Sequence, residues 1–174
     1  MNGARIAISA IVVSALIAGI ALYYLQVYAF YDEVTDGGVE LTPVTSDVAE
    51  PILFADFQAI DADSSPLRYR ACFTTQMSEA MLTETYKVYD AAEPRVAPDW
   101  FECFDADAIG AALEDGTATA YLGEENVQYG IDRVVGIMSD GRGFVWHQIN
   151  GCGEVVFDGR RAPEGCPTPP ETLQ

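Results

Sequence analysis

The four cysteines of this chain have the most definite chemistry. Cys72, Cys103, Cys152 and Cys166 are widely spaced, and they form neither a Cys-x-x-Cys pair nor the Cys-x-x-Cys-His motif of haem attachment. This spacing argues against thiol exchange and covalent haem. In an oxidising compartment it predicts two disulfides, for which three connectivities are possible. We expect Cys72 to pair with Cys103 and Cys152 with Cys166, because neighbours in sequence need the fewest topological assumptions.

Other reactive side chains form weaker patterns. His147 is the one histidine, and zinc needs three or four nitrogen or sulfur ligands, so we expect an ordinary strand residue. Asp61–Ser65 resembles the start of a calcium loop but lacks its glycine, and Cys72 stands where the bidentate glutamate belongs. Asp105 and Asp107 suggest a carboxylate pair for glycoside chemistry, yet a helix cap explains Asp105. We predict no catalytic residue, no metal site and no cofactor.

The segment Asp99–Phe104, with the sequence DWFECF, is the most aromatic part of the chain beyond its first 31 residues. Packing in a core beside Cys103 is the first interpretation. An aromatic docking patch made by Trp100, Phe101 and Phe104 is the second, because Trp and Phe are enriched in the centres of interfaces.

The amino-terminal part has the composition of a membrane span. Ile6–Leu25 is a predominantly apolar stretch of 20 residues, which as a helix covers the roughly 30 Å of bilayer hydrocarbon. A cleaved signal peptide would have a shorter core followed by small residues at a cleavage site, whereas Tyr23, Tyr24 and Leu25 are bulky. We therefore expect an uncleaved anchor, with a cleaved signal and a buried helix as the alternatives.

The charges around this segment predict its direction. Arg5 precedes the span and the next cation is Arg68, so the amino terminus is expected on the cytoplasmic side. Aromatic residues suited to the headgroup region follow, namely Tyr23, Tyr24, Tyr28, Phe30 and Tyr31. Arg outnumbers Lys eight to one, a bias typical of high-GC bacterial genomes, so we expect an inner-membrane protein whose main body is periplasmic.

Small residues recur along the span at helical spacing. Such positions let another membrane helix approach closely, although alanine is common enough for the pattern to arise by chance. The residues are Ala10, Ser14 and Ala18 on one face, with Ala15 and Gly19 on an adjoining face.

Charge is distributed very unevenly. The 27 acidic residues all lie from Asp32 onward with eight of the nine cations, which gives this part a formal charge of −19. Nucleic acid and anionic lipid surfaces require a basic face, so neither is an expected partner for this part. The charge suits a cationic partner, and it also suits simple solubility.

The remaining length fits one α+β domain. We expect an anchor at residues 1–31, an extended acidic connector at 32–50 and a periplasmic domain with an antiparallel sheet at 51–174. Expected elements are a strand or short helix at 51–61, a half-buried strand at 66–75 and a helix at 78–89. A helix from Asp105 to Gly116 follows, then strands at 117–122, 131–138 and 143–149, and a further strand at 154–159.

Longer segments together resemble an uncharacterised family of small membrane-anchored proteins of alphaproteobacteria. They are YYLQVYAFYDEVT, DFQAIDADSSPLRYRACFTT, WFECFDADAIGAALE, YGIDRVVGIMSDGRGFVWHQINGCGEVVFDG and PEGCP. The resemblance implies a periplasm-facing inner-membrane protein and no particular activity.

The function most consistent with these features is a non-catalytic accessory subunit of an inner-membrane complex. A respiratory-chain complex is the most concrete expectation, with a cationic c-type cytochrome as a visitor to the acidic domain. The alternatives are a tethered domain that binds a small ligand or catalyses a reaction, and an assembly factor that leaves its mature client.

Overall fold

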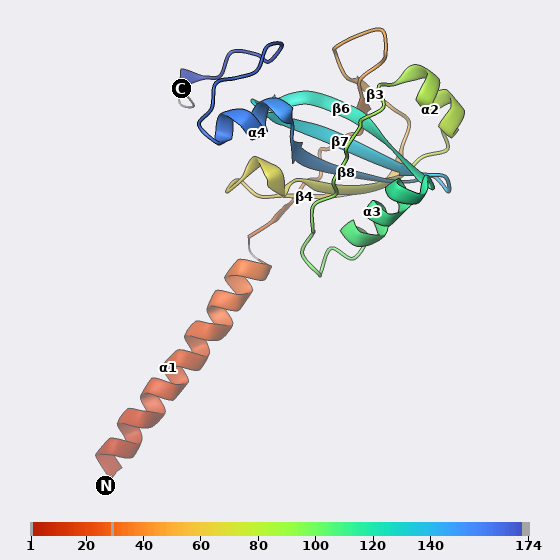
Figure 1. Cartoon of the computed structure of the whole chain (residues 1–174). Coiled ribbons are helices and arrows are strands. Elements are labelled where there is room, and N and C mark those ends of the chain that lie inside the picture. Colours follow the sequence, from red (N-terminus) through yellow and green to blue (C-terminus); the bar gives the residue numbers. More distant parts are fainter. Residues whose placement is uncertain (1, 29, 172–174) are drawn as a thin grey trace. The chain divides into compact units, whose positions relative to one another are not determined.

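The computed structural model describes residues 2–28 and 30–171, and the chain divides into two compact units, Met1–Asp32 and Glu33–Gln174. Helix α1 (Asn2–Val27) dominates the first unit (Figure 1). Within the described residues it is the one helix long and apolar enough to cross a membrane. Side chains 3–26 are exposed, which suits a lipid environment better than a protein core. The expected helix is therefore confirmed, with the properties of a membrane anchor or a signal sequence.

The second unit is built on a six-stranded sheet in the order β1-β4-β5-β8-β7-β6. Adjacent strands from β4 to β6 are all antiparallel, as expected for this α+β domain. A small second sheet pairs β2 with β3. The strands are β1 (Asp32–Glu33), β2 (Glu40–Leu41), β3 (Glu50–Pro51), β4 (Ala55–Asp61), β5 (Arg70–Thr74), β6 (Ala118–Gln128), β7 (Ile131–Met138) and β8 (Arg142–Ile149).

Short capped helices connect the strands. They are α2 (Glu79–Thr85), α3 (Ala106–Asp115) and α4 (Gly151–Phe157), with a 3₁₀ helix at Pro66–Arg68. The Asp105 carboxylate accepts hydrogen bonds from the amides of Asp107 and Ala108 at 3.1 and 3.0 Å. Gly116 ends α3 with a φ of 78°, where a side chain would be strained. The predicted helix between Asp105 and Gly116 is confirmed, and so is the hairpin of β7 and β8.

One face of the sheet is covered by α3 and by the loop that precedes it (Figure 1). The register places Arg70 and Cys72 of β5 on the same face as Trp146 and Phe144 of β8. Ile109 of α3 is buried over this face. These side chains are therefore shielded from water on this face of the sheet. The opposite face is covered as well, so the sheet is buried on both sides.

The opposite face carries the main hydrophobic cluster, which the β2–β3 segment and α2 cover. Gly143 lies opposite Phe73 in the register, and a Cβ at that position would collide with the Phe73 ring. A glycine is therefore needed for the two strands to pair here. The cluster comprises Val39, Leu41, Ile52, Ala59, Tyr69, Ala71, Phe73, Leu82, Tyr86, Tyr121, Val135, Ile137 and Val145.

Three expectations were wrong. Residues 32–50 are not simply a connector, because Val39, Leu41 and Thr42 are buried in the core and the globular unit starts at Glu33. Strand β5 is buried on both faces rather than half-buried, since it lies in the middle of the sheet. The last expected strand, at 154–159, is instead helix α4, which begins because the Asn150 side chain accepts hydrogen bonds from two amides of its first turn.

Candidate functional site

The cysteines are used as structural cross-links. Cys72 of β5 is bonded to Cys103, and Cys152 of α4 is bonded to Cys166 in the carboxyl-terminal tail. This is the pairing favoured from the sequence. No described cysteine is free, so thiol chemistry has no available group in this part of the chain.

His147 of β8 is buried and uses both ring nitrogens in hydrogen bonds. Its Nε2 accepts from Nε of Arg133 at 3.1 Å, so Nδ1 carries the proton and donates to the Pro66 carbonyl at 2.6 Å. The Tyr69 ring stacks on the imidazole with centroids 4.9 Å apart. Burial lowers the pKa of His147 to about 4, and the positive charge of Arg133 acts in the same direction. The imidazole is thus held neutral by its burial and by the adjacent Arg133 guanidinium, against the opposite effect of the hydrogen bond to Pro66.

The acidic segment Asp61–Ser65 forms a turn after β4 and contributes with His147 to a shallow cavity of about 290 Å³. The Asp61 carboxylate accepts a hydrogen bond from the Ala62 amide at 2.8 Å, and burial raises the pKa of Asp61. Within residues 2–28 and 30–171, no group of three or more His, Cys, Asp or Glu is placed to hold a metal ion. This turn therefore offers no cage of carboxylates for calcium.

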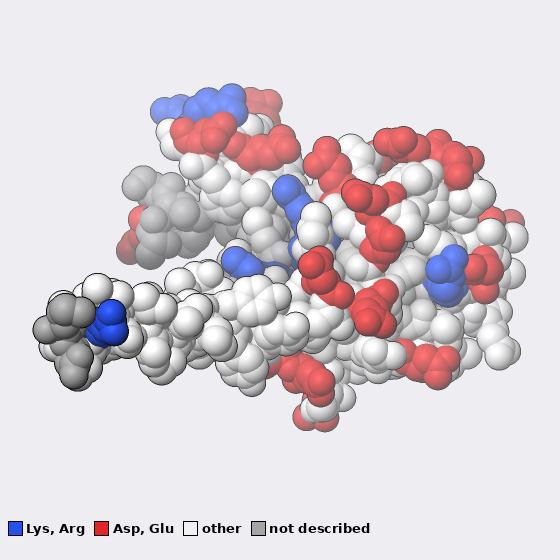
Figure 2. Space-filling model, turned by 90° about the horizontal axis from the view of Figure 1, so that it is seen from below, with Lys and Arg blue, Asp and Glu red and all other residues white. Residues whose placement is uncertain are grey.

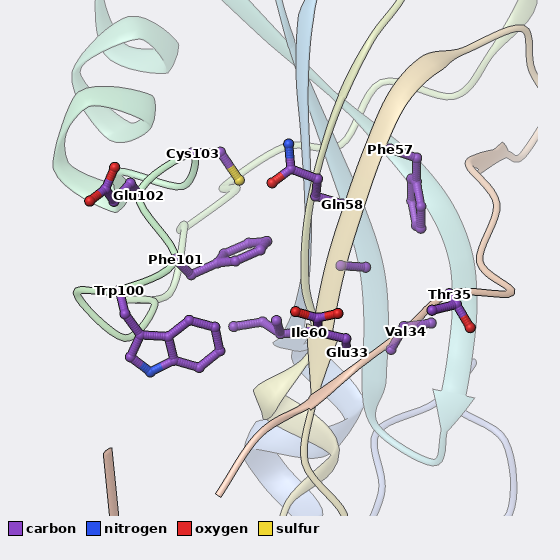
Figure 3. Close-up of a pocket in the computed structure, with 11 residues that line it drawn as sticks. Glu33, Val34, Thr35, Phe57, Gln58, Ile60, Trp100, Phe101, Glu102 and Cys103 are labelled. Atoms are coloured by element: carbon purple, nitrogen blue, oxygen red, sulfur yellow. The ribbon is translucent and has the colours of Figure 1, made fainter. Parts of the chain in front are cut away.

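A groove of about 690 Å³ lies between one edge of the sheet and the loop that leads to α3 (Figure 3). Ile60 of β4 and Glu33 of β1 lie on the sheet side. Trp100 and Phe101 lie on the loop side, with their rings pointing toward Ile60 and Glu33 (Figure 3). Three segments that are far apart in the sequence, residues 33–35, 57–60 and 100–103, thus form one recess.

The register of β4 explains how the sheet side of the groove is built. Gln58 pairs with Cys72 and Ile60 pairs with Arg70, so Gln58 and Ile60 point to the face that α3 covers. Ile60 is buried, whereas Gln58 is exposed beside the sulfur of Cys103 (Figure 3). An apolar floor and a side-chain amide therefore lie next to each other.

The loop side of the groove is held in place by covalent and polar contacts. The disulfide between Cys103 and Cys72 ties it to the centre of the sheet. Upstream, the buried guanidinium of Arg70 donates to the carbonyl oxygens of Arg95 at 2.8 Å and Val96 at 3.1 Å. The loop is consequently fixed at both ends, and the groove does not depend on a bound partner for its form.

The charges of the groove are negative. Glu33 and Glu102 line it and are exposed, and none of its described lining residues is Lys or Arg. Acidic side chains are also spread over the face of the globular unit that Figure 2 shows, where basic ones are fewer. A recess with aromatic and aliphatic walls and nearby carboxylates suits a ligand that is apolar along its length and positively charged at one end.

The three expected docking residues have different positions. Trp100 is half-buried and Phe101 is 7% exposed, and both line the groove. Phe104 does not, because it is 5% exposed and packs edge to face on the rings of Phe144 and Trp146. Its assignment as a docking residue is corrected, since it belongs to the core beneath α3.

The small residues expected to pack against another membrane helix are exposed along α1. The Ser14 hydroxyl donates a hydrogen bond to the Ile11 carbonyl of its own helix at 3.0 Å. Their contact with a second helix stays a prediction for Ala10, Ser14 and Ala18 and for Ala15 and Gly19.

Sequence reasoning missed the sheet side of the groove. Glu33 lies in the stretch expected to be a connector, and Gln58 and Ile60 lie in segment 51–61, for which the sequence leaves a strand and a short helix open. The available signal was the aromatic segment, which indicated Trp100 and Phe101. The residues opposite them follow only from the strand order, which places β1 and β4 at the same edge.

Fold and groove together define a small, disulfide-bonded α+β domain with an acidic recess, preceded by an apolar helix. A family model described as a family of unknown function (DUF6446) matches residues 39–167, so the chain belongs to that family. The expected membership of an uncharacterised family is confirmed by this match. Searches of curated proteins and of solved structures gave no significant match.

Proposed function

We propose that this protein is a non-catalytic accessory subunit of a bacterial inner-membrane complex, anchored by α1 with its globular unit in the periplasm. The observation that carries the proposal is the preformed groove with an acidic surface in a chain that begins with an apolar helix. The side chains best suited to chemistry support a binding role. The cysteines form disulfides, and His147 is buried with both ring nitrogens engaged.

A respiratory-chain complex is the assembly that we propose first. Its mobile electron carriers on the periplasmic side include cationic c-type cytochromes, and an acidic domain attracts such proteins over distances of roughly 8–10 Å at physiological salt. The formal charge of −18 supports this partner class. Attraction of this kind weakens as salt concentration rises.

The test is copurification. The full-length chain, tagged at the carboxyl terminus and extracted from fresh membranes in mild detergent, is separated by native electrophoresis. We expect it to migrate well above the position of its own 18.8 kDa mass and to carry the same partner proteins in stoichiometric amount. Migration as a free chain contradicts the proposal, and recovery of a client in much less than stoichiometric amount indicates an assembly factor instead.

A second candidate function is the binding of a small ligand by a tethered periplasmic domain. The volume of the groove, about 690 Å³, falls within the range of small-molecule sites and favours this alternative. A ligand that binds the folded state raises the melting temperature of the protein. A concentration-dependent rise with a periplasmic metabolite, in a chain that migrates alone, supports this second function.

A further inference from the structure

We propose that the groove lined by Ile60, Phe101 and Glu33 is the docking site for a basic, extended segment of a partner protein. The inference rests on the proposed function and identifies the surface and the partner chemistry. A Lys or Arg side chain of the segment lies along the apolar wall, and its charged end meets the carboxylate of Glu33.

The apolar part of the site is the reason to expect a long basic side chain rather than a simple ion. Ile60 and Phe101 are buried, at 1% and 7% exposure, yet both line the recess. Lys and Arg carry three or four methylene groups that pack on such a surface while their charged ends remain near water. An inorganic cation would gain nothing from this wall.

The polar part of the site supplies the opposite charge. Glu33 comes from the sheet edge and its carboxylate lies beside Ile60 in the recess, whereas the Glu102 side chain points from the loop away from it (Figure 3). The amide of Gln58 projects from β4 toward Cys103 and can bond to the backbone of an extended segment (Figure 3). A cation on the partner therefore has one carboxylate to meet inside the groove and a second at its rim.

The rigidity of the site favours a segment of a protein that adapts to it. The Cys72–Cys103 disulfide and the hydrogen bonds of Arg70 fix the loop side before binding. A preformed groove loses little conformational entropy on binding, so the ordering cost falls on the incoming segment. Short, weak and salt-dependent contacts of this type suit the attachment of a subunit that α1 already holds at the membrane.

The experiment measures binding of a fluorescent eight-residue peptide of alternating leucine and arginine to the full-length protein in detergent micelles. A matched peptide carries glutamine in place of every arginine. We expect the arginine peptide to bind and the glutamine peptide to bind at least about ten-fold more weakly, because the ion pair with Glu33 and the attraction to the carboxylates around the groove are lost. Absence of binding by the arginine peptide, or equal binding of the two peptides, overturns the inference.

Two protein variants separate the groove from the general acidity of the surface. The double variant Glu33→Gln with Glu102→Gln removes both carboxylates, whereas Glu84→Gln with Glu114→Gln removes two exposed carboxylates from α2 and α3. We expect about ten-fold weaker binding for the first variant and less than about two-fold change for the second. Equal losses in the two variants would show diffuse attraction to the acidic surface and would overturn the assignment to the groove.

Native electrophoresis of the same variants separates failure of this inference from failure of the proposed function. We expect the groove variant to be lost from the complex more readily than the control variant as salt rises. If the wild-type chain joins a complex and the groove variant stays in it equally well, the groove assignment alone is wrong. If the wild-type chain migrates alone, the accessory-subunit function is wrong whatever the peptides do.

Discussion

At the scale of single residues, burial decides the protonation state of His147. Three groups enclose His147. They are the ring of Tyr69, which directly precedes β5, the guanidinium of Arg133 in β7 and the carbonyl of Pro66. Protonation would place a second N–H against the Arg133 guanidinium and bring two positive charges together. The folded state therefore stabilises the neutral imidazole.

This geometry predicts that stability depends on pH. The pKa of His147 is about 4 in the folded state against 6.5 for an unperturbed histidine, so the unfolded state binds the proton more readily. The contribution to stability is complete above pH 6.5 and is lost progressively as the pH falls toward 4, by up to about 3 kcal/mol. Urea unfolding of the full-length protein between these pH values measures it.

The control for this prediction is His147→Gln, which cannot titrate. The variant is expected to be less stable at pH 7.5 because it loses the stacking on Tyr69, but its stability should fall less on acidification than that of the wild type. Identical pH profiles would show that the fall arises from other groups rather than from the histidine, such as the Asp140 carboxylate, whose pKa is lowered by the hydrogen bond from the Arg142 amide.

At the scale of elements, the best-predicted ones were those with complete local signals. Helix α3 is preceded by the capping residue Asp105, has an apolar pair four residues apart at Ile109 and Leu113, and is terminated by Gly116. The β7–β8 hairpin has an Asp-Gly turn between two apolar runs. Local chemistry and tertiary context agree in both. Sequence alone was therefore sufficient to place them.

The prediction of an element failed where the local preference of the sequence and the tertiary context differ. The paired valines of α4 favour a strand, but the Asn150 cap and packing against the end of β8 produce a helix. In residues 32–50 the many acidic side chains predicted a solvated connector, although Val39 and Leu41 are apolar. These two residues are buried in the core because β2 lies beside β6. The groove was half-predicted for a related reason, since only the strand order, which puts β1 beside β4, assembles its sheet side.

A prediction at this scale concerns the loop between α2 and α3. The buried Arg70 guanidinium donates hydrogen bonds to carbonyl oxygens on both sides of it, among them those of Arg95 and Val96 in this loop. Arg70→Leu leaves these acceptors without their donor and is expected to lower the free energy of unfolding by about 3 kcal/mol. Urea unfolding measures the loss, and trypsin should cut faster after Arg95 in the loosened loop.

The matched control is Arg142→Leu, because Arg142 is an exposed arginine at the start of β8 whose ion pair with Asp140 is open to water. Its effect on stability should stay within about 0.5 kcal/mol. Comparable losses in the two variants would mean that the carbonyl oxygens near Arg70 find other partners.

At the scale of the whole molecule, charge and hydropathy separate along the chain. The apolar helix carries one cation, Arg5, near its amino-terminal end, and all 27 acidic residues follow the helix. Positive charge near a span stays cytoplasmic, so the proposed topology places the globular unit outside. The two disulfides of that unit suit an oxidising compartment.

The topology is tested with reporters fused after Gln174. Alkaline phosphatase, which needs an oxidising compartment, should be active there, whereas a fluorescent protein that matures only in the cytoplasm should stay dark. Labelling of denatured, unreduced protein should find no free thiol among the four cysteines. Activity of the cytoplasmic reporter alone, or four reactive thiols, contradicts both the topology and the proposed function.

The connectivity of the cross-links bears on how the protein matures. Each bridge joins cysteines that are consecutive in the chain, the first with the second and the third with the fourth. A thiol oxidase that meets the polypeptide as it emerges, amino end first, would make the native bonds in order of appearance. Cells lacking a disulfide isomerase should therefore still produce the correctly oxidised form.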